Sequence, residues 1–358
     1  MFAAILFSLK DIYSTERKEL IIMKKGITLK DIARKLNMSI STVSKSLNSD
    51  HSISTLTKER VQVLAKEWGY IPNESARNFK LSKSLTIGLI LPDLRDQFYV
   101  EAINGVEEIA EKEKYNIILS QTHEEVIKEE NIANVMIKNR VDGLIIAVTK
   151  NTVDMTIFDK FKSVGIPVIC IVREPKNHSF NYVSINNLEG AFIATVFLIK
   201  KGHQRIAHIM GPETLQISQL RLEGYKQALQ KNGIPLDKDL VKVVDFTKEE
   251  TEKAMLELMS LEVPPSAIFT FKNYITLDAM EVLKKKYPDK LSSIDFTDFG
   301  NLLLFEYLDK KPIASIEENF YEVGKQAALL LFQMINEENQ DQYKAPKNIQ
   351  IPCKLIVH

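Results

Sequence analysis

The chain has 358 residues, of which 45% are hydrophobic and 26% charged, and its formal net charge at neutral pH is zero. This length exceeds one ordinary domain, and the composition is typical of a globular protein rather than a disordered or collagen-like one. No apolar run approaches the roughly 20 residues of a membrane-spanning helix. Two cysteines are too few for a disulfide framework, so we expect a protein of the reducing cytoplasm.

Residues 1–22 begin with the apolar stretch MFAAILFSL, which resembles part of a secretion signal. No basic residue precedes this stretch, and Lys10 and Asp11 follow it without a small-residue cleavage site, so a signal peptide is not indicated. Met23, directly before the run KKGITLKD, is a plainer start. We therefore expect residues 1–22 to be an extension that results from a mis-assigned start.

Charge is unevenly distributed along the chain. The segment from Lys24 to Lys83 contains 12 Lys and Arg residues and five Asp and Glu residues, a net charge of +7, so the remainder carries −7. A basic end on an acidic body is expected where one end contacts nucleic-acid phosphates. A solvated helical surface would explain the same charge, so charge alone leaves both readings open.

This basic segment predicts a head of three short helices. Thr28 stands where the N-cap of the first helix belongs, and Ser39 is placed to cap the second. A third helix is expected to begin at the cap Thr57 and to end at Gly69. Two helices around a short turn, braced by a third, make a helix-turn-helix. The apolar side chains at helical spacing are Leu29, Ile32, Ala33, Leu36, Val43, Leu47, Val61, Leu64, Ala65 and Trp68.

The second helix of the head leaves a polar face pointing outward, made of Ser41, Thr42, Ser44 and Lys45. Hydroxyl groups can approach base edges or phosphates closely, and a lysine can reach the O6 or N7 atom of guanine. The plain alternative is that these side chains only decorate a surface helix. That alternative does not explain why a basic three-helix unit keeps this face free of bulky groups, so we expect the head to read DNA.

From Leu85 onward, strand-like and helix-like runs alternate in two successive series. This alternation predicts parallel sheets covered by helices on both faces, and two series predict two similar lobes. We expect the segment after Ile313 to return to the first lobe. Expected strands lie at 85–92, 116–122, 143–148, 167–172, 181–186, 205–211, 240–246, 266–271 and 291–296, and expected helices at 98–114, 124–140, 155–164, 188–201, 217–232, 249–261 and 275–286.

The chain resembles the LacI/GalR family of bacterial transcription regulators. In the head, the resemblance is carried by TLKDIARKLNMSISTVSKSLN, GYIPN and ARNFK. It continues through TIGLILPD, VDGLII, GIPVI, KGHQRIAHIMGP, RLEGYKQAL and VGKQAALLL, and it covers almost all of 24–358. Together these motifs are far more specific than a generic helix-turn-helix pattern.

The resemblance implies a particular set of DNA contacts. In the family, the outward face of the second helix enters the major groove, and a hinge helix, here Asn73 to Lys80, enters the minor groove. Phe79 occupies the position of a Leu that wedges into the central base step, although packing against Ile71 is the plain alternative. The implied DNA-binding residues are Thr28, Ile40, Ser41, Thr42, Ser44, Lys45, Asn48, Ala76, Arg77, Phe79 and Lys80.

The resemblance also implies a body with periplasmic-binding-protein architecture. We expect the helix-turn-helix domain at 23–70, a hinge helix and linker at 71–84, and an effector-binding and dimerisation domain at 85–358. The first lobe is expected at about 85–184 and 314–346, and the second at about 185–313 and 347–358. Ligands of such folds bind between the lobes, at the carboxyl ends of strands.

By family position, the effector-binding residues are expected to be Phe98, Tyr99, Arg173, Arg221, Lys272, Asn273, Asp298 and Phe320. Relatives use the equivalent of Arg221 to donate hydrogen bonds to an effector, and the alternative is an arginine on the surface of a helix. For Phe98, the alternative is packing in the core.

Three departures from the family pattern bear on the ligand. Relatives have an acidic pair where this chain has Thr297 and Asp298, an Asn-Asp pair where it has Lys272 and Asn273, and an Asp beside the equivalent of Arg173. Fewer carboxylates and an added lysine hint at a sugar phosphate or another acidic metabolite rather than a plain sugar. They are also consistent with no small effector at all.

Enzyme signatures are absent: the sequence contains no GxGxxG, P-loop, HExxH or GxSxG pattern. His203 and His208, at i and i+5, are a poor pair of metal ligands, so neither a metal nor a cofactor is expected. We expect a homodimeric, effector-controlled repressor that binds a pseudo-palindromic operator and no membrane. The alternatives are a regulator of the same fold that activates or needs no ligand, and a solute-binding protein.

Overall fold

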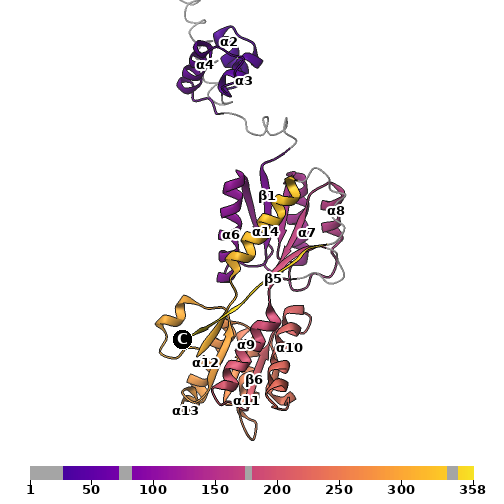
Figure 1. Ribbon diagram of the computed structural model, residues 1–358, viewed down its shortest axis with the longest axis vertical. Helices are drawn as coiled ribbons and strands as arrows, with labels where there is room; N and C mark the ends of the chain where they lie inside the picture. Colours follow the sequence, from indigo (N-terminus) through magenta and orange to yellow (C-terminus); the bar gives the residue numbers. More distant parts are fainter. Residues whose placement is uncertain (1–26, 72–82, 174–179, 337–345) are drawn as a thin grey trace, which may run out of the picture. The chain divides into compact units, whose positions relative to one another are not determined.

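In the computed structural model, residues 27–71, 83–173, 180–336 and 346–358 are described (Figure 1). The chain divides into two compact units, residues 1–82 and 83–358, which we call the head and the body. Each unit is considered by itself. The expected start extension at 1–22 and the expected hinge helix lie outside the described residues.

Between residues 27 and 71 the head contains three helices, α2 (Leu29–Leu36), α3 (Ile40–Leu47) and α4 (Thr55–Glu67). Thr28 and Asp31 form a capping box at the start of α2, in which each side chain bonds the backbone N–H of the other residue. The α2 helix ends at Asn37, which has the left-handed conformation that Asn tolerates better than most residues. The Ser39 hydroxyl then accepts a hydrogen bond from the Thr42 N–H and starts α3.

The expected N-cap of the third helix was wrong by three residues. Ser54, not Thr57, is the N-cap of α4: its hydroxyl accepts a hydrogen bond from the Thr57 N–H, and the helix begins at Thr55. Thr57 looked like a cap because it is a hydroxyl residue, but its backbone is already the third helical position. The small core beneath the three helices is formed by Ile32, Ala33, Val43, Val61 and Ala65.

The first lobe of the body contains a six-stranded sheet in the order β11-β5-β4-β3-β1-β2, in which every pairing is parallel. Its central strands are buried along their whole length, except for the first residue of β1, as in sheets covered on both faces. The strands are β1 (Thr86–Leu91), β2 (Asn116–Gln121), β3 (Gly143–Ile146), β4 (Val168–Ile171), β5 (Asn181–Ile185) and β11 (Asn348–Ile351). The helices are α6 (Gln97–Glu113), α7 (Val126–Lys138), α8 (Thr156–Ser163) and α14 (Phe320–Asn336).

The second lobe contains another six-stranded sheet, in the order β12-β10-β9-β8-β6-β7, parallel except for the edge strand β12. The strands are β6 (Ile206–Met210), β7 (Val241–Val243), β8 (Ala267–Thr270), β9 (Asp295–Phe299), β10 (Ala314–Glu317) and β12 (Lys354–Val357). The helices are α9 (Asn187–Lys200), α10 (Gln216–Lys231), α11 (Lys248–Met259), α12 (Asn273–Lys286) and α13 (Pro288–Leu291), with 3₁₀ turns η1 (Lys238–Leu240) and η2 (Leu303–Tyr307).

The structure corrects the expected division between the lobes. Strand β10 pairs with β9 and stays in the second lobe, whereas α14 and β11 belong to the first lobe and β12 returns to the second. The expected strand at 291–296 is also displaced, because Pro288 starts a short helix and the strand begins only at Asp295. The sequence pattern could not show these crossings, since strand pairing is set by partners distant in the chain.

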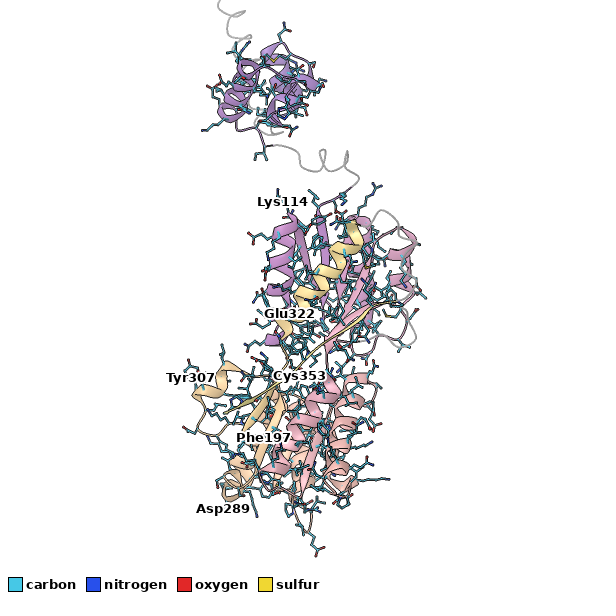
Figure 2. The ribbon with its side chains drawn as sticks, in the orientation of Figure 1. Lys114, Phe197, Asp289, Tyr307, Glu322 and Cys353 are labelled. Carbon is cyan, nitrogen blue, oxygen red and sulfur yellow. The ribbon has the colours of Figure 1, made fainter. Side chains whose placement is uncertain are left out.

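The chain therefore passes between the lobes three times, after β5, after β10 and after β11. In Figure 1 the yellow C-terminal segment runs obliquely from the first lobe to the second, and Cys353, labelled in Figure 2, lies on this crossing. Three adjacent crossings allow the lobes to move about a common hinge while each lobe stays rigid.

Close helix packing braces the first lobe. Helices α6 and α14, far apart in the sequence, lie side by side (Figure 1). Gly105 of α6 and Gly324 of α14 permit this approach, because a Cβ atom at either position would collide with backbone of the opposite helix. None of the helices in the described part of the chain is long and apolar enough to cross a membrane.

Candidate functional site: the head surface and the cleft of the body

Helix α3 presents different side chains to the head core and to solvent. Val43 and Ser46 are buried, and the Ser46 hydroxyl donates to the Thr42 carbonyl oxygen within the helix. Ile40, Ser41 and Lys45 are exposed, and Ile40 retains 48% of its accessible surface. The exposed face therefore combines one apolar, one hydroxyl and one cationic group, which are the kinds of side chain that contact base edges in a major groove.

Other predicted DNA contacts also have structural roles. Thr42 shares a 2.8 Å hydrogen bond with the Ser39 hydroxyl at the start of α3. The Asn48 side chain donates to the Ser44 carbonyl oxygen at 2.9 Å and closes the end of the helix. Thr28 bonds Asp31 at the start of α2, where hydrogen bonds from Thr28 lower the pKa of the Asp31 carboxyl. Ala76, Arg77, Phe79 and Lys80 lie outside the described residues.

The body contains a cleft of 540 Å³ that is lined by both lobes and by the segments that join them. A cleft of this size accommodates a small metabolite. The structure brings seven of the eight predicted effector-binding residues together in its wall: Phe98, Tyr99, Arg173, Arg221, Lys272, Asn273 and Phe320.

Asp298 does not line this cleft, contrary to the expectation. It lies within β9 and is completely buried, and its carboxyl oxygen accepts a 2.8 Å hydrogen bond from the Thr276 hydroxyl. Burial raises its pKa to about 8. Because Asp298 is enclosed between its own sheet and α12, it cannot reach a ligand in the cleft in this conformation. Its hydrogen bond to Thr276 instead joins β9 to α12.

Arg173 is the main polar group of the first lobe at the cleft. Its guanidinium donates to both carboxylate oxygens of Glu124, at 2.7 and 2.9 Å, and to the Val148 carbonyl oxygen. Burial disfavours the Glu124 charge, but the hydrogen bonds and attraction of Arg173 outweigh it and lower the pKa of Glu124. The charge of Arg173 is therefore already matched within its own lobe.

Arg221, on α10, is the corresponding group of the second lobe and is almost completely buried. Its guanidinium donates to Glu318 at 2.8 Å, to the Asn187 side-chain oxygen at 2.8 Å and to the Phe271 carbonyl oxygen. Burial raises the pKa of Glu318, and Arg221 opposes that rise. Since Asn187 and Glu318 adjoin two of the crossings between lobes, Arg221 ties those crossings to α10.

Lys272 and Asn273 stand at the start of α12, at the carboxyl end of β8. The Lys272 ammonium lies 3.7 Å from an oxygen of Asp96 in the first lobe and 4.9 Å from the centre of the Phe246 ring. The Asn273 side chain donates to the Gly300 carbonyl oxygen at 3.2 Å. Here the second lobe reaches across the cleft to the first.

Aromatic rings line the cleft from both lobes. In the first lobe the ring of Phe98 lies 4.7 Å from that of Phe320, between ring centres. In the second lobe Phe246 and Phe271 are 5.1 Å apart. The Tyr99 hydroxyl is buried without a hydrogen-bond partner in the described structure, and burial raises its pKa. Ring faces of this kind favour a ligand with a flat ring or an apolar sugar face.

Sequence reasoning missed the carboxylates of the cleft. Asp96, Glu101, Glu124, Glu317 and Glu318 line it, against the four cations Arg173, Arg221, Lys272 and Lys354. The expectation of an acidic ligand rested on missing carboxylates at family positions, but carboxylates from other segments take their place. The available signal was the acidic pair at 317–318, which lies a few residues after the crossing expected at 313–314.

The two neighbouring histidines have separate environments. His203 shares hydrogen bonds with Ser266 and Asp295, whereas His208 is buried and stacked on Phe269. Burial lowers the pKa of His208 to about 4, so it is neutral at physiological pH. Within the described residues, no group of three or more side chains could hold a metal ion.

Comparison with known proteins agrees with this architecture. Residues 28–73 match the family model described as bacterial regulatory proteins, lacI family, and residues 84–358 match periplasmic binding proteins and sugar binding domain of LacI family. The chain is 33% identical to the HTH-type transcriptional repressor CytR of Escherichia coli (strain K12), over 92% of this chain and 95% of that protein. It is 28% identical to catabolite control protein A of Priestia megaterium, over 92% and 98%.

Solved structures share the fold. A transcriptional regulator CelR–cellobiose complex matches with 25% identity and a TM-score of 0.67, over 92% of this chain and 98% of that one. The Lac repressor dimer bound to operator and the anti-inducer ONPF matches with 21% identity and a TM-score of 0.78, over 93% and 98%. These relatives include named transcriptional repressors rather than enzymes. The chain therefore belongs to the LacI family of bacterial regulatory proteins.

Proposed function

We propose that this protein is a cytoplasmic repressor whose head binds a specific operator and whose body binds a small effector that changes operator affinity. The observation that carries the proposal is the exposed face of α3, where Ile40, Ser41 and Lys45 project from a helix that is capped and held by the head core. The named repressors among its full-length relatives support the same reading.

The cleft supports an uncharged effector with a flat ring or a sugar-like face. Arg173 and Arg221 are each bonded to a carboxylate, so a phosphate or carboxylate on a ligand would have to displace an existing partner. The ring pairs Phe98–Phe320 and Phe246–Phe271 offer apolar faces instead. The CelR relative was solved with cellobiose, which is itself an uncharged sugar.

Coupling between the sites follows from the two-lobed body. An effector can shift an equilibrium between open and closed lobe arrangements only if it binds one arrangement more tightly. The aromatic pairs and charged groups of the cleft come from both lobes, so their spacing depends on lobe closure. Closure would then alter the affinity of the head for its operator.

The homodimer belongs to the same proposal. The turn η2 exposes Leu303, Leu304 and Tyr307, and Tyr307 retains 82% of its accessible surface (Figure 2). Clustered exposed apolar side chains support a protein contact, and a second copy would give a pseudo-palindromic operator. In sedimentation, the unmodified chain should be dimeric and a Leu304→Glu, Tyr307→Asp variant should shift toward monomer. An unchanged dimer would place the contact elsewhere.

The head is tested by selection of bound DNA. The purified full chain is incubated with a random duplex library, and the retained duplexes are sequenced after several rounds at moderate salt. We expect enrichment of an inverted repeat with half-sites about one helical turn, roughly 10 base pairs, or a multiple of it apart. Retention without any enriched sequence would contradict sequence-specific binding.

The cleft is tested by calorimetry with matched ligands. Cellobiose, ribose and a pyrimidine nucleoside are compared with ribose 5-phosphate and a nucleoside monophosphate. Heat from an uncharged compound but not from its phosphate supports the proposed chemistry; preferential binding of the phosphates contradicts it. Silence toward every compound, together with unchanged operator affinity, favours the second candidate, a regulator that acts without a small ligand.

A further inference from the structure

We propose that Lys272 and Asp96 form a latch across the cleft, which holds the two lobes together without a ligand. This inference deepens the proposed function and rests on it for its regulatory meaning. Asp96 immediately precedes α6 in the first lobe, and Lys272 immediately precedes α12 in the second. The pair therefore joins parts of the body that move apart when the lobes open.

The geometry places opposite charges close together at a half-buried position. The Lys272 ammonium and an oxygen of Asp96 are 3.7 Å apart, and the two side chains retain 24% and 26% of their accessible surface. Such partial burial excludes part of the water that weakens fully exposed ion pairs. The ring of Phe246 lies 4.9 Å from the ammonium and that of Tyr274 lies 5.6 Å from it, so two aromatic faces of the second lobe also hold the cation at the cleft.

Both residues depart from the usual chemistry of a helix start. An Asp at the N-cap normally accepts a hydrogen bond from the first turn, but the Asp96 side chain makes no such bond. A cation at the same position is opposed by the partial positive charge of the helix N-terminus, yet Lys272 occupies it in α12. Asp96 therefore does not cap its own helix, and Lys272 is electrostatically unfavourable at the start of its helix. Each of them instead pairs with the other across the cleft.

Neighbouring charged groups link the Lys272–Asp96 pair electrostatically to the crossings between the lobes. Glu318, on the crossing that follows β10, attracts Lys272 and repels Asp96, and Arg221 holds Glu318 from α10. Arg173 attracts Asp96 from within the first lobe. An effector entering the cleft would meet this network, so its binding and lobe closure would both depend on whether Lys272 keeps Asp96 as its partner.

The latch is tested by measuring the distance between the lobes without a ligand. Spin labels are attached at Glu113→Cys, the last residue of α6 in the first lobe, and at Asp289→Cys in α13 of the second lobe, and both positions are exposed. Of the native thiols, Cys170 is buried, and burial raises the pKa of Cys353 to about 12, so neither should react. Labelled chain is mixed with excess unlabelled chain, and distances are read by pulsed electron resonance.

Asp96→Asn and Lys272→Met should each shift the distance distribution to longer and broader values. Raising the salt concentration should lengthen the distance in the unmodified chain and leave it unchanged in Lys272→Met. The exchanged pair Asp96→Lys with Lys272→Asp should recover part of the original distribution. Circular dichroism melting curves confirm that each variant is folded.

The matched control is Lys242→Met, which removes a partly exposed ion pair, Lys242–Glu257, that lies within the second lobe. It should leave the distance unchanged. Distances in Asp96→Asn and Lys272→Met that equal those of the unmodified chain, or a control that moves them equally, would overturn the latch. Because these measurements need no DNA, that outcome is distinct from a failure to select an operator, which would overturn the proposed function.

Discussion

The head and the cleft of the body use polar side chains in opposite ways. On α3, Ser41 and Lys45 project into solvent from a helix whose shape is fixed by its caps and core. In the cleft, the half-buried Arg173 and the buried Arg221 are bonded to carboxylates 49 and 97 residues away in the sequence. The head therefore offers solvent-exposed polar groups to DNA, whereas the cleft offers a pre-formed network that a ligand must fit.

This difference explains what the sequence could predict. The helix spacing and caps of the head are local, so three helices and the outward face of α3 followed directly from the residues. The start of α4 was wrong because Ser54 and Thr57 are both plausible caps, and only the hydrogen bond between them decides the choice. Local patterns thus predict exposed faces well and boundaries less well.

In the cleft, the resemblance to the family correctly indicated most of the lining side chains, but it did not indicate which groups those side chains bond. Arg221 was expected to donate to an effector, yet the structure occupies it with Glu318, Asn187 and a backbone carbonyl. Asp298 was expected at the ligand and lies beneath Thr276. These outcomes depend on tertiary pairing and on strand orientation, which no spacing rule in a single sequence contains.

The largest expected effect comes from breaking the buried pair of the cleft. Arg221→Met leaves Glu318 buried without its cation, and we expect a loss of about 3–5 kcal/mol in the free energy of unfolding of the body. Urea denaturation measures this loss. Adding Glu318→Leu should recover most of it, because an apolar pair has no charge to desolvate.

Lys286→Met is the matched control for that experiment. It breaks a largely exposed pair with Glu252 and should leave the urea midpoint almost unchanged. If Arg221→Met costs no more than this control, the cleft network does not stabilise the body.

A second test of the cleft concerns the pH dependence of stability. Asp298 has a pKa of about 8 in the folded protein against an ordinary 3.8, so the folded state binds a proton that the unfolded state releases. Its contribution to stability is full below about pH 4 and is lost as pH rises toward about 8. Asp298→Asn cannot titrate, so its stability relative to the unmodified chain should increase across this window in urea titrations. A difference that is constant with pH would contradict the buried carboxyl.

The exposed lysine of α3 should contribute to sequence-specific binding. Lys45→Ala should weaken binding to the selected operator by roughly 5- to 150-fold, the cost of about 1–3 kcal/mol for losing a base contact. Binding to a random duplex should fall much less, and Lys66→Ala on α4 serves as the matched loss of charge. Fluorescence anisotropy measures the affinity of the unmodified chain and of both variants for each duplex. Equal losses on both duplexes would assign Lys45 to the phosphate backbone instead.

The smallest expected effect separates structure from recognition within one helix. Ser39→Ala removes the cap of α3 and should cost the head about 1 kcal/mol, seen as faster amide hydrogen exchange in that helix. Ser41→Ala, whose side chain is exposed, should leave exchange unchanged and weaken operator binding. The same exchange pattern in both variants would contradict the division between cap and contact.

Sequence-specific recognition by α3 is measured by the ratio of affinities for the selected operator and a random duplex, determined as a function of salt. A specific regulator should bind its operator at least about 10³-fold more tightly than random DNA at physiological salt. Both affinities should also fall steeply with added salt, because lysines and arginines of the head displace counterions. A ratio near one at every salt concentration would show a basic head that holds DNA without reading it, and would contradict the account given for α3.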